Sequence, residues 1–250
     1  MPLDLEAVRR RLPGRDVEWH AVVDSTMTVA REQARSGYAA GAVVGADRQT
    51  AGVGRHGHAW YSEPDAGLYV SVLLGGDADA DFCRFLTLAA GLAVREAIEA
   101  VGAVRCDLRW PNDVLIGDRK CAGILIASGA GLVAGIGINV NHVRFPAELA
   151  ATATSLRIAT GRSHSREDLL VATLESLDRH TTLLAREGGA SILRAFEEAS
   201  SYARGRRVVV DQDDGVLEGV TGGLDSSGFL ILRDNSGASS LIVTGGVRPA

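Results

Sequence analysis

Lysine is almost absent from this 250-residue sequence: Lys120 is the only one, although lysine and arginine together number 26. The two cations are interchangeable on a solvated surface but not in a tight site, where an ammonium is a compact point charge and a guanidinium is a larger planar fork. The sequence therefore indicates that position 120 requires an ammonium. The alternative is that Lys120 lies on an exposed hairpin and was retained by chance, because lysine is mostly a surface residue.

The sequence also lacks an apolar run of membrane-spanning length and the apolar core of a signal peptide, so we expect a cytoplasmic protein with no membrane partner. Its formal net charge of -5 argues against a general nucleic-acid-binding protein. The few cysteines are scattered, without metal-ligand spacing. We expect reduced, mostly buried thiols at Cys83, Cys106 and Cys121.

Two domains are predicted, over residues 1–202 and 203–250. Hydrophobic residues make up 46% of the chain, which is enough for a substantial core, and the composition changes near residue 203. After that point, short apolar runs alternate with Asp-Gly and Ser-Gly turns, a pattern typical of a small barrel or sandwich. These runs cover residues 208–210, 216–220, 229–232 and 241–244.

In the first domain, helical periodicity with capping signals alternates with short apolar runs. Helices are expected at residues 4–12, 27–35, 81–101, 166–186 and 192–199, and strands at 19–23, 42–46 and 68–74.

A hairpin is predicted around Lys120. Pro111 cannot donate to a sheet ladder and favours extended backbone at the residue before it, so a strand over 107–110 should end there. A loop at 112–113, a two-residue turn at 117–118 and a returning strand over 121–127 should follow.

That hairpin brings Lys120 back toward Asn112 and Asp113. Oxygen-rich side chains and an ammonium at one strand end suit a phosphate with a divalent metal, since magnesium takes carboxylate oxygens and phosphates. An Asx-capped turn is the alternative for Asn112 and Asp113.

Residues 52–57 match the Gly-x-Gly-x-x-Gly dinucleotide fingerprint. The fingerprint must open a helix between two strands, whereas Trp-Tyr-Ser-Glu-Pro follows here at 60–64. A P-loop is excluded because no Gly-Lys-Ser/Thr occurs. We therefore expect a flexible loop that closes over an anion with its backbone N–H groups and with Arg55, His56 and His58. A mobile surface connection is the alternative.

Two further segments offer polar groups to a ligand. Asp24-Ser25-Thr26 precedes a predicted helix, so its hydroxyls should lie at a helix N-terminus, where they bind polar or anionic groups or simply cap the helix. Residues 131–141 are typical of a buried strand in which glycines allow close approach of a ligand. Within it, Asn139 either offers its amide to a base or phosphate, or is a buried, satisfied asparagine.

Five motifs occur in a fixed order within residues 19–202, and together they resemble biotin protein ligases. The motifs are Asp24-Ser25-Thr26; Gln49 with Gly52-x-Gly54-Arg55-x-Gly57-x-x-Trp60; Trp110-Pro111-Asn112-Asp113; Lys120-x-x-Gly123-Ile124-Leu125; and Gly135-x-Gly137-Ile138-Asn139-Val140-Asn141. The C-terminal β segments resemble the SH3-like domain of that family. The resemblance implies an α+β fold like that of class II aminoacyl-tRNA synthetases and biotin ligases, a mixed sheet with flanking helices, followed by a small SH3-like β-barrel.

The resemblance also implies an enzyme, a biotin–[biotin carboxyl carrier protein] ligase. Such a ligase uses ATP and Mg2+ to form biotinyl-5′-AMP and then transfers biotin to a lysine of a biotin carboxyl carrier protein. Bifunctional members carry an N-terminal winged helix, for which the residues before 24 are too few, so we expect no DNA partner and either a monomer or a homodimer. A lipoate or octanoyl ligase or transferase of the same fold, or a non-catalytic biotin-binding protein, stays open as an alternative.

Residue roles are implied by the same motifs. Lys120 and Arg55 are the implied catalytic residues, and Asp113 is implied to help place metal and phosphate. Two positions depart from the family pattern, since Met27 stands where asparagine is frequent and Val53 where arginine is frequent. Biotin contacts are implied for Ser25, Thr26, Gln49, Gly52, Val53, Gly54, Arg55, Lys120, Gly123 and Gly135, and ATP contacts for Arg55, His56, Gly57, Trp60, Asn112 and Asn139.

Overall fold

The structure is a computed structural model that describes residues 3–129, 131–212 and 215–250. Its central feature is a mixed sheet of seven strands: β1 Val17–Val23, β2 Val43–Gln49, β3 Gly67–Leu73, β4 Asp107–Arg109, β5 Asp113–Ile116, β6 Arg119–Ala127 and β7 Val133–Asn139. They lie in the order β1-β2-β3-β7-β6-β5-β4. β1 and β2 are parallel and the other neighbouring pairs are antiparallel.

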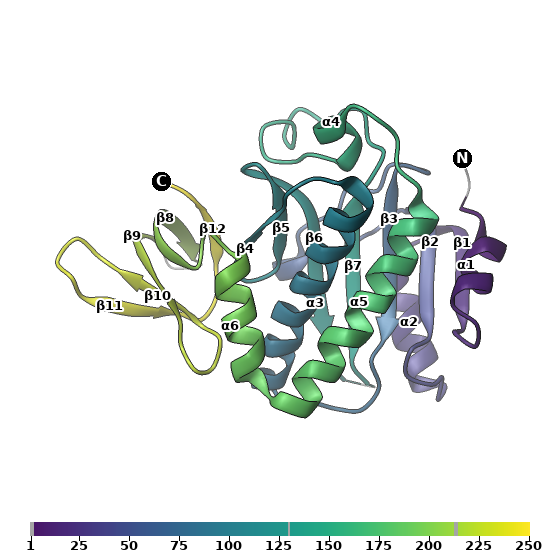
Figure 1. Ribbon diagram of the computed structural model, residues 1–250, viewed down its shortest axis with the longest axis horizontal. Coiled ribbons are helices and arrows are strands. Elements are labelled where there is room, and N and C mark those ends of the chain that lie inside the picture. The colour runs from purple at the N-terminus through teal and green to yellow at the C-terminus, as the bar shows by residue number, and fades with distance from the viewer. Residues whose placement is uncertain (1–2, 130, 213–214) are drawn as a thin grey trace.

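Helices cover both faces of this sheet. They are α1 Leu5–Arg11, α2 Thr26–Arg35, α3 Ala80–Gly102, α4 Leu156–Thr160, α5 Arg166–Glu187 and α6 Gly189–Ala199, with a short 3-10 segment at Arg55–Gly57. α3 and α5 lie side by side across one face, as Figure 1 shows. The α4 helix was not predicted, although Ser155 caps it by accepting from the Ile158 N–H.

The alternation of side chains along β3 separates two cores. Leu68, Val70 and Val72 are buried in the large core with α3 and α5, whereas Leu73 belongs to a smaller cluster that includes Ala30 of α2. Successive residues of a strand point to opposite faces, so α2 packs on the face opposite α3 and α5. On that second face, α2 leaves part of the sheet uncovered.

A second sheet follows at the C-terminus. Its strands are β8 Arg204–Gln212, β9 Gly215–Leu224, β10 Leu230–Arg233, β11 Ser239–Ile242 and β12 Gly246–Pro249, in the order β11-β10-β9-β8-β12. β11 and β12 are the two edges and do not pair with each other within the described residues, so a closed barrel is not formed there. Four of these strands were predicted and β12 was not. The boundary between residues 202 and 203 stays a prediction.

The predicted hairpin around Lys120 is present, with its turn at 117–118 between β5 and β6. One detail differs, because Asp113 lies in β5 instead of the preceding loop. Asp113 pairs with Arg109 in the β4–β5 ladder, so a tight turn of three residues connects these strands. The Trp110–Pro111 peptide bond in this turn is cis.

None of the helices in the described part of the chain is long and apolar enough to cross a membrane.

Candidate active site

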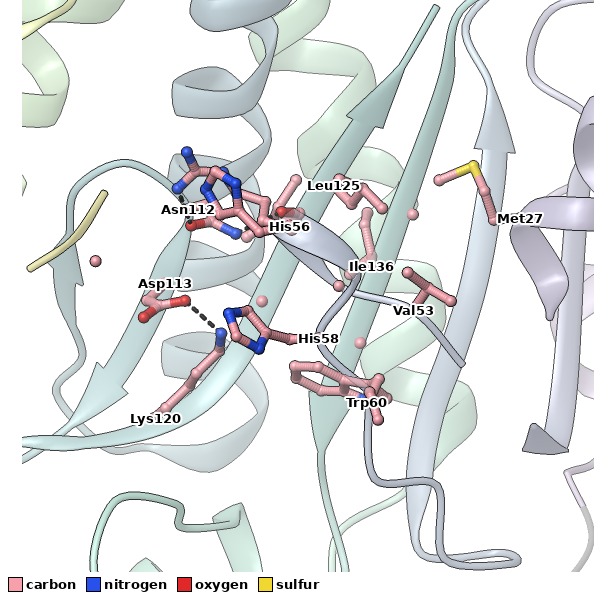
Figure 2. Close-up of a pocket in the computed structure, with 18 of the residues that line it drawn as sticks. Met27, Val53, His56, His58, Trp60, Asn112, Asp113, Lys120, Leu125 and Ile136 are labelled. Carbon is pink, nitrogen blue, oxygen red and sulfur yellow. Dashed lines mark hydrogen bonds and ion pairs between the residues drawn. The ribbon is translucent and has the colours of Figure 1, made fainter. Parts of the chain in front are cut away.

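A cavity of about 570 Å3 opens on the sheet face that α2 partly covers. This volume is typical of a small-molecule site. Its walls come from the N-terminus of α2, the loop at 50–60, the strands β6 and β7, and loops of the C-terminal sheet. In Figure 2, Met27 and Val53 lie on one side of the cavity, and Asp113 and Lys120 lie on the other.

Lys120 reaches this cavity because β6 contains an irregularity. Val114 pairs with Ala122, but the next residue of β5, Leu115, pairs with Lys120, so β6 accommodates one extra residue. A bulge of this kind re-aims side chains. As a result Lys120 and Gly123 both face the cavity, although residues three apart in a regular strand point to opposite faces.

Lys120, Asp113 and Arg109 form a charged cluster. The Lys120 Nζ lies 2.5 Å from Asp113 Oδ1, and Arg109 Nη2 donates to Asp113 Oδ2 at 2.7 Å. The Asp113 side chain is only 15% exposed. Burial by itself raises the pKa of this carboxyl, but the charges and hydrogen bonds of Lys120 and Arg109 outweigh that effect and hold the pKa below its usual value. Asp113 is therefore an ionised carboxylate with a cation at each oxygen.

The glycine-rich loop folds back on itself beside this cluster. Val53 pairs with Ala59, and the Gly54 N–H donates to the His58 carbonyl oxygen at 2.8 Å. Arg55 begins the 3-10 segment that fills the tip. The loop therefore presents its side chains to the cavity from a defined backbone.

Arg55 is the permanent cation of this loop. Its Nη1 donates to Asn112 Oδ1 at 3.4 Å. Burial lowers the pKa of Arg55, and the Asp113 carboxylate partly offsets this. His56 and His58 line the cavity as well, and Figure 2 places His58 near Lys120. Arg55 and Lys120 thus bring two cations to one end of the cavity.

We predict that ligands order this loop, because Gly54 and its neighbours allow backbone freedom that ligand contacts restrict. Limited trypsin cleavage after Arg55 should slow when biotin and ATP, the ligands that the resemblance implies, are added together. Cleavage after Arg207, which lies in the C-terminal sheet and outside the cavity, serves as the internal control. Equal cleavage rates at Arg55 with and without ligands would contradict a closing loop.

The other end of the cavity is a small hydrogen-bonding network. The Thr26 N–H and hydroxyl both donate to Gln49 Oε1, at 2.8 Å and 3.1 Å, and the Thr26 hydroxyl lies 2.9 Å from Ser71 Oγ. Ser25 is the N-cap residue of α2, yet its side chain makes no capping hydrogen bond. Its hydroxyl is therefore not committed to the helix. Ser71 was not predicted, although a single serine in the apolar run 68–74 was a usable signal.

Glycines form the floor between the two ends. A Cβ on Gly137 would lie 2.5 Å from the Trp60 indole, and one on Gly135 would lie 2.7 Å from Met27 Cε. Gly123 is similar, since its Cβ would be 3.0 Å from Trp60 and from Lys120. Gly123 and Gly137 are paired across β6 and β7. Larger residues here would displace the side chains that shape the cavity, which is the close approach that strand glycines permit.

Most of the predicted site residues line this one cavity: Ser25, Thr26, Gln49, Val53, Gly54, Arg55, His56, Trp60, Asn112, Asp113, Lys120, Gly123 and Gly135. Gly52, Gly57 and Asn139 are not among the lining residues. Asn139 is buried at 4% exposure, and its side-chain amide donates to the Thr154 carbonyl oxygen at 3.1 Å. The individual ligand roles stay predictions.

The C-terminal sheet supplies lining residues that the sequence analysis did not anticipate. They are Asp211, Gln212, Thr244, Gly245 and Gly246. Gln212 Nε2 donates to the Thr244 carbonyl oxygen at 3.2 Å, which joins the end of β8 to the loop before β12. No local motif marks these residues, because only the packing of the second sheet against the first brings them to the cavity.

The described residues contain no group of three histidine, cysteine or acidic side chains arranged to hold a metal ion. Asp113, the predicted metal ligand, already has a cation at each carboxylate oxygen. These residues therefore do not fit a resident metal centre, and a metal role for Asp113 stays a prediction.

Known proteins are similar to this chain in both sequence and fold. The sequence model of the Biotin/lipoate A/B protein ligase family matches residues 19–141. A biotin–[acetyl-CoA-carboxylase] ligase of Mycobacterium tuberculosis is 32% identical over 257 aligned positions, covering 98% of this chain and 94% of that protein. The chain belongs to the biotin protein ligase family.

Other biotin protein ligases support the same assignment. The bifunctional ligase/repressor BirA of Bacillus subtilis is 32% identical over 244 residues, covering 94% of this chain and 74% of BirA. The solved biotin protein ligase from Aquifex aeolicus, in complex with biotin and ATP, superposes with a TM-score of 0.82 at 30% identity, covering 94% of this chain and 99% of that one. The mixed sheet with flanking helices is thus the fold of these ligases.

Proposed function

We propose that this chain activates biotin with ATP and transfers it to a lysine of a biotin carboxyl carrier protein. The observation that carries the proposal is the layout of the cavity, where the hydrogen-bonding network of Thr26, Gln49 and Ser71 lies at one end and the cations Arg55 and Lys120 at the other. A polar ring system with a carboxylate tail fits such a layout. The Aquifex aeolicus structure, whose ligands are biotin and ATP, supports the choice of substrates.

The reaction has two steps. In the first, a biotin carboxylate oxygen attacks the α-phosphorus of ATP and pyrophosphate leaves with the electrons of the broken P–O bond, which gives biotinyl-5′-AMP. In the second, the neutral amine of the carrier lysine attacks the acyl carbon of this mixed anhydride. AMP leaves, the nitrogen loses a proton, and an amide remains.

The first step needs positive charge because a carboxylate must approach an anionic phosphate. Lys120 and Arg55 are positioned to supply it, and one unit-charge pair 4 Å apart is worth about 4 kcal/mol at an effective dielectric constant of about 20. Each ~1.4 kcal/mol of extra transition-state stabilisation raises the rate about tenfold. Preorganised charge at the reacting centre is therefore sufficient to account for a large part of the catalysis.

The substrates are assigned to the two ends of the cavity on chemical grounds. Ser25, Thr26 and Gln49 would hydrogen-bond the biotin ring system, with Ser71 holding Thr26 in place. Trp60 would lie against adenine, since its ring is at the glycine floor and its indole N–H is buried without a hydrogen-bond partner in the described part of the chain. Mg2+ would enter with the ATP phosphates as part of that substrate. The C-terminal sheet would be an SH3-like module, and the enzyme would act in the cytoplasm without DNA.

The test is to incubate the purified chain with ATP, Mg2+, isotope-labelled biotin and labelled octanoate, and to identify adenylates by mass spectrometry. We expect biotinyl-5′-AMP, and transfer of the label when a biotin carboxyl carrier domain is added. Octanoyl-AMP without biotinyl-AMP would instead identify a lipoate- or octanoate-type ligase. Biotin binding without any adenylate would identify a non-catalytic binding protein.

We predict that, with Val53 in the loop, biotinyl-AMP dissociates faster than it would with arginine at this position. The residue lines the cavity with a half-exposed side chain, at the position where the motif resemblance implies a frequent arginine. One partly screened cation beside an anionic intermediate is worth about 0.2–1 kcal/mol. Val53→Arg should therefore slow biotinyl-AMP dissociation by up to about fivefold, measured by stopped-flow fluorescence, with Val143→Arg as an exposed control outside the cavity. An unchanged or faster dissociation rate would reject this explanation.

A further inference from the structure

Arg109 is a charged residue next to the site but not in it. Its side chain is 16% exposed and donates to Asp113 at 2.7 Å, yet Arg109 is not among the residues that line the cavity. Asp113 and Lys120 do line it. Arg109 can therefore act on the substrates only indirectly, through Asp113 and through the charge that it adds to the cluster.

The charges of this cluster show what Arg109 adds. Lys120 and Asp113 alone form an ion pair at 2.5 Å whose charges sum to zero. Such a pair acts on the phosphates as a dipole, whose potential falls off faster with distance than that of a net charge. Arg109 occupies the second carboxylate oxygen and leaves the three groups with a net charge of +1. Its contribution is largest in a cavity from which water is partly excluded.

We propose that Arg109 is a positioning and charge-balancing residue for adenylation. Arg109 neutralises the Asp113 carboxylate through Oδ2 and fixes its orientation, so that Oδ1 orients the Lys120 ammonium. The charge of Lys120 then acts on the biotin carboxylate and the ATP phosphate. This inference rests on the proposed adenylation reaction. Arg109 itself contacts neither substrate.

A purely structural role for the Arg109–Asp113 contact is less well supported. The two residues are already opposite each other in the antiparallel pairing of β4 and β5, so the backbone ladder holds these strands without the ion pair. Outside the cluster, the Arg109 guanidinium has a ring contact with Tyr202, 6.0 Å from the ring centroid. That distance is at the outer limit for a cation–π interaction.

Single variants test the charge. In single-turnover assays, Arg109→Gln should lower the rate of biotinyl-AMP formation at saturating substrates by at least about tenfold, while the dissociation constant for biotin changes less than about twofold. Arg109→Lys, which keeps the charge, should restore most of the rate. Arg15→Gln is the control, because the Arg15 side chain is 14% exposed, similar to that of Arg109, and its ion pair with Asp178 lies outside the cavity. It should leave the rate unchanged, and thermal unfolding of all three variants reports any loss of folding.

A double variant separates charge balance from structure. Asp113→Asn removes the negative charge that Arg109 offsets. In this background, Arg109→Gln should lower the rate of biotinyl-AMP formation less than about twofold, whereas in the unmodified chain it lowers the rate about tenfold. The double variant again has a net charge of +1 from Lys120. Equal costs in the two backgrounds, a normal rate for Arg109→Gln, or an Arg109→Lys variant as slow as Arg109→Gln would each overturn the proposal. Absence of biotinyl-AMP from the unmodified chain would overturn the proposed function instead.

Discussion

Replacing Lys120 with arginine should abolish most adenylate formation although the charge is kept. The ammonium occupies a crowded position, 2.5 Å from Asp113 Oδ1 and 5.5 Å from the Trp60 ring centroid. A Cβ placed on Gly123 would be only 3.0 Å from Lys120 Cε, so the floor beside this side chain is already closely packed. A planar guanidinium is larger and would displace either Asp113 or a substrate oxygen.

The expected loss for Lys120→Arg is at least about a hundredfold in the single-turnover rate, which corresponds to roughly 2.7 kcal/mol of transition-state stabilisation. Biotin binding should change much less, because the interaction is made chiefly in the transition state. Lys120→Ala should be at least as impaired. Arg119→Lys, the reverse exchange at the exposed neighbouring position, is the control and should keep the normal rate.

The single lysine also allows a chemical test without mutation. An amine-acylating reagent can modify no other side-chain amine in the chain, so it should inactivate the protein, and biotin with ATP should protect against this. Near-normal adenylation by Lys120→Arg would mean that Lys120 supplies only generic charge. Its being the only lysine would then be an accident of composition.

Adding one methyl group at Gly137 should weaken ATP binding strongly. The new Cβ would lie 2.5 Å from the Trp60 indole, a distance that no packed Cβ tolerates, so the indole must move. If Trp60 lies against adenine, Gly137→Ala should raise the KM for ATP by at least about tenfold, or roughly 1.4 kcal/mol. The biotin dissociation constant should stay within about threefold, because the nearest atoms to the new Cβ all belong to Trp60 and none to Thr26 or Gln49.

Gly91→Ala is the matched control for this variant. Gly91 is buried in α3, but a Cβ there would meet its nearest neighbours at 3.8 Å and 3.9 Å, which is ordinary contact. This control should bind both substrates normally in isothermal titration and steady-state assays. A Gly137→Ala protein with unchanged KM for ATP would show that Trp60 does not hold the nucleotide.

The elements themselves were largely predictable, because their signals are local. The periodicity in 81–101 and 166–186 predicted α3 and α5, and the Gly-Asp pair at 117–118 predicted the turn between β5 and β6. α4 was missed because it has only five residues, too few for a periodic pattern. β12 was missed because its four residues pair with β8, which lies far away in the sequence.

Part of the candidate site was also predictable, because some of its residues carry local sequence signals. Motifs such as Ser25-Thr26 and Lys120-x-x-Gly123 combine residues that are close in sequence, and the structure brings them to one cavity. Ser71 and the loop around Thr244 carry no such motif. Asn139 belongs to a motif but donates its amide to Thr154 outside the cavity, because a motif specifies a residue type and not the direction of its side chain.

The sequence by itself determined most of the segments that form helices and strands, and the family to which the motifs are similar; that an ammonium is needed at position 120 stays its prediction. Only the tertiary structure decided how these parts meet. The bulge in β6 turns Lys120 to the same face as Gly123, and the β4–β5 pairing places Arg109 behind Asp113. Propensity and turn chemistry act over a few neighbouring residues, whereas pairing register and the packing of the second sheet depend on contacts between segments distant in sequence.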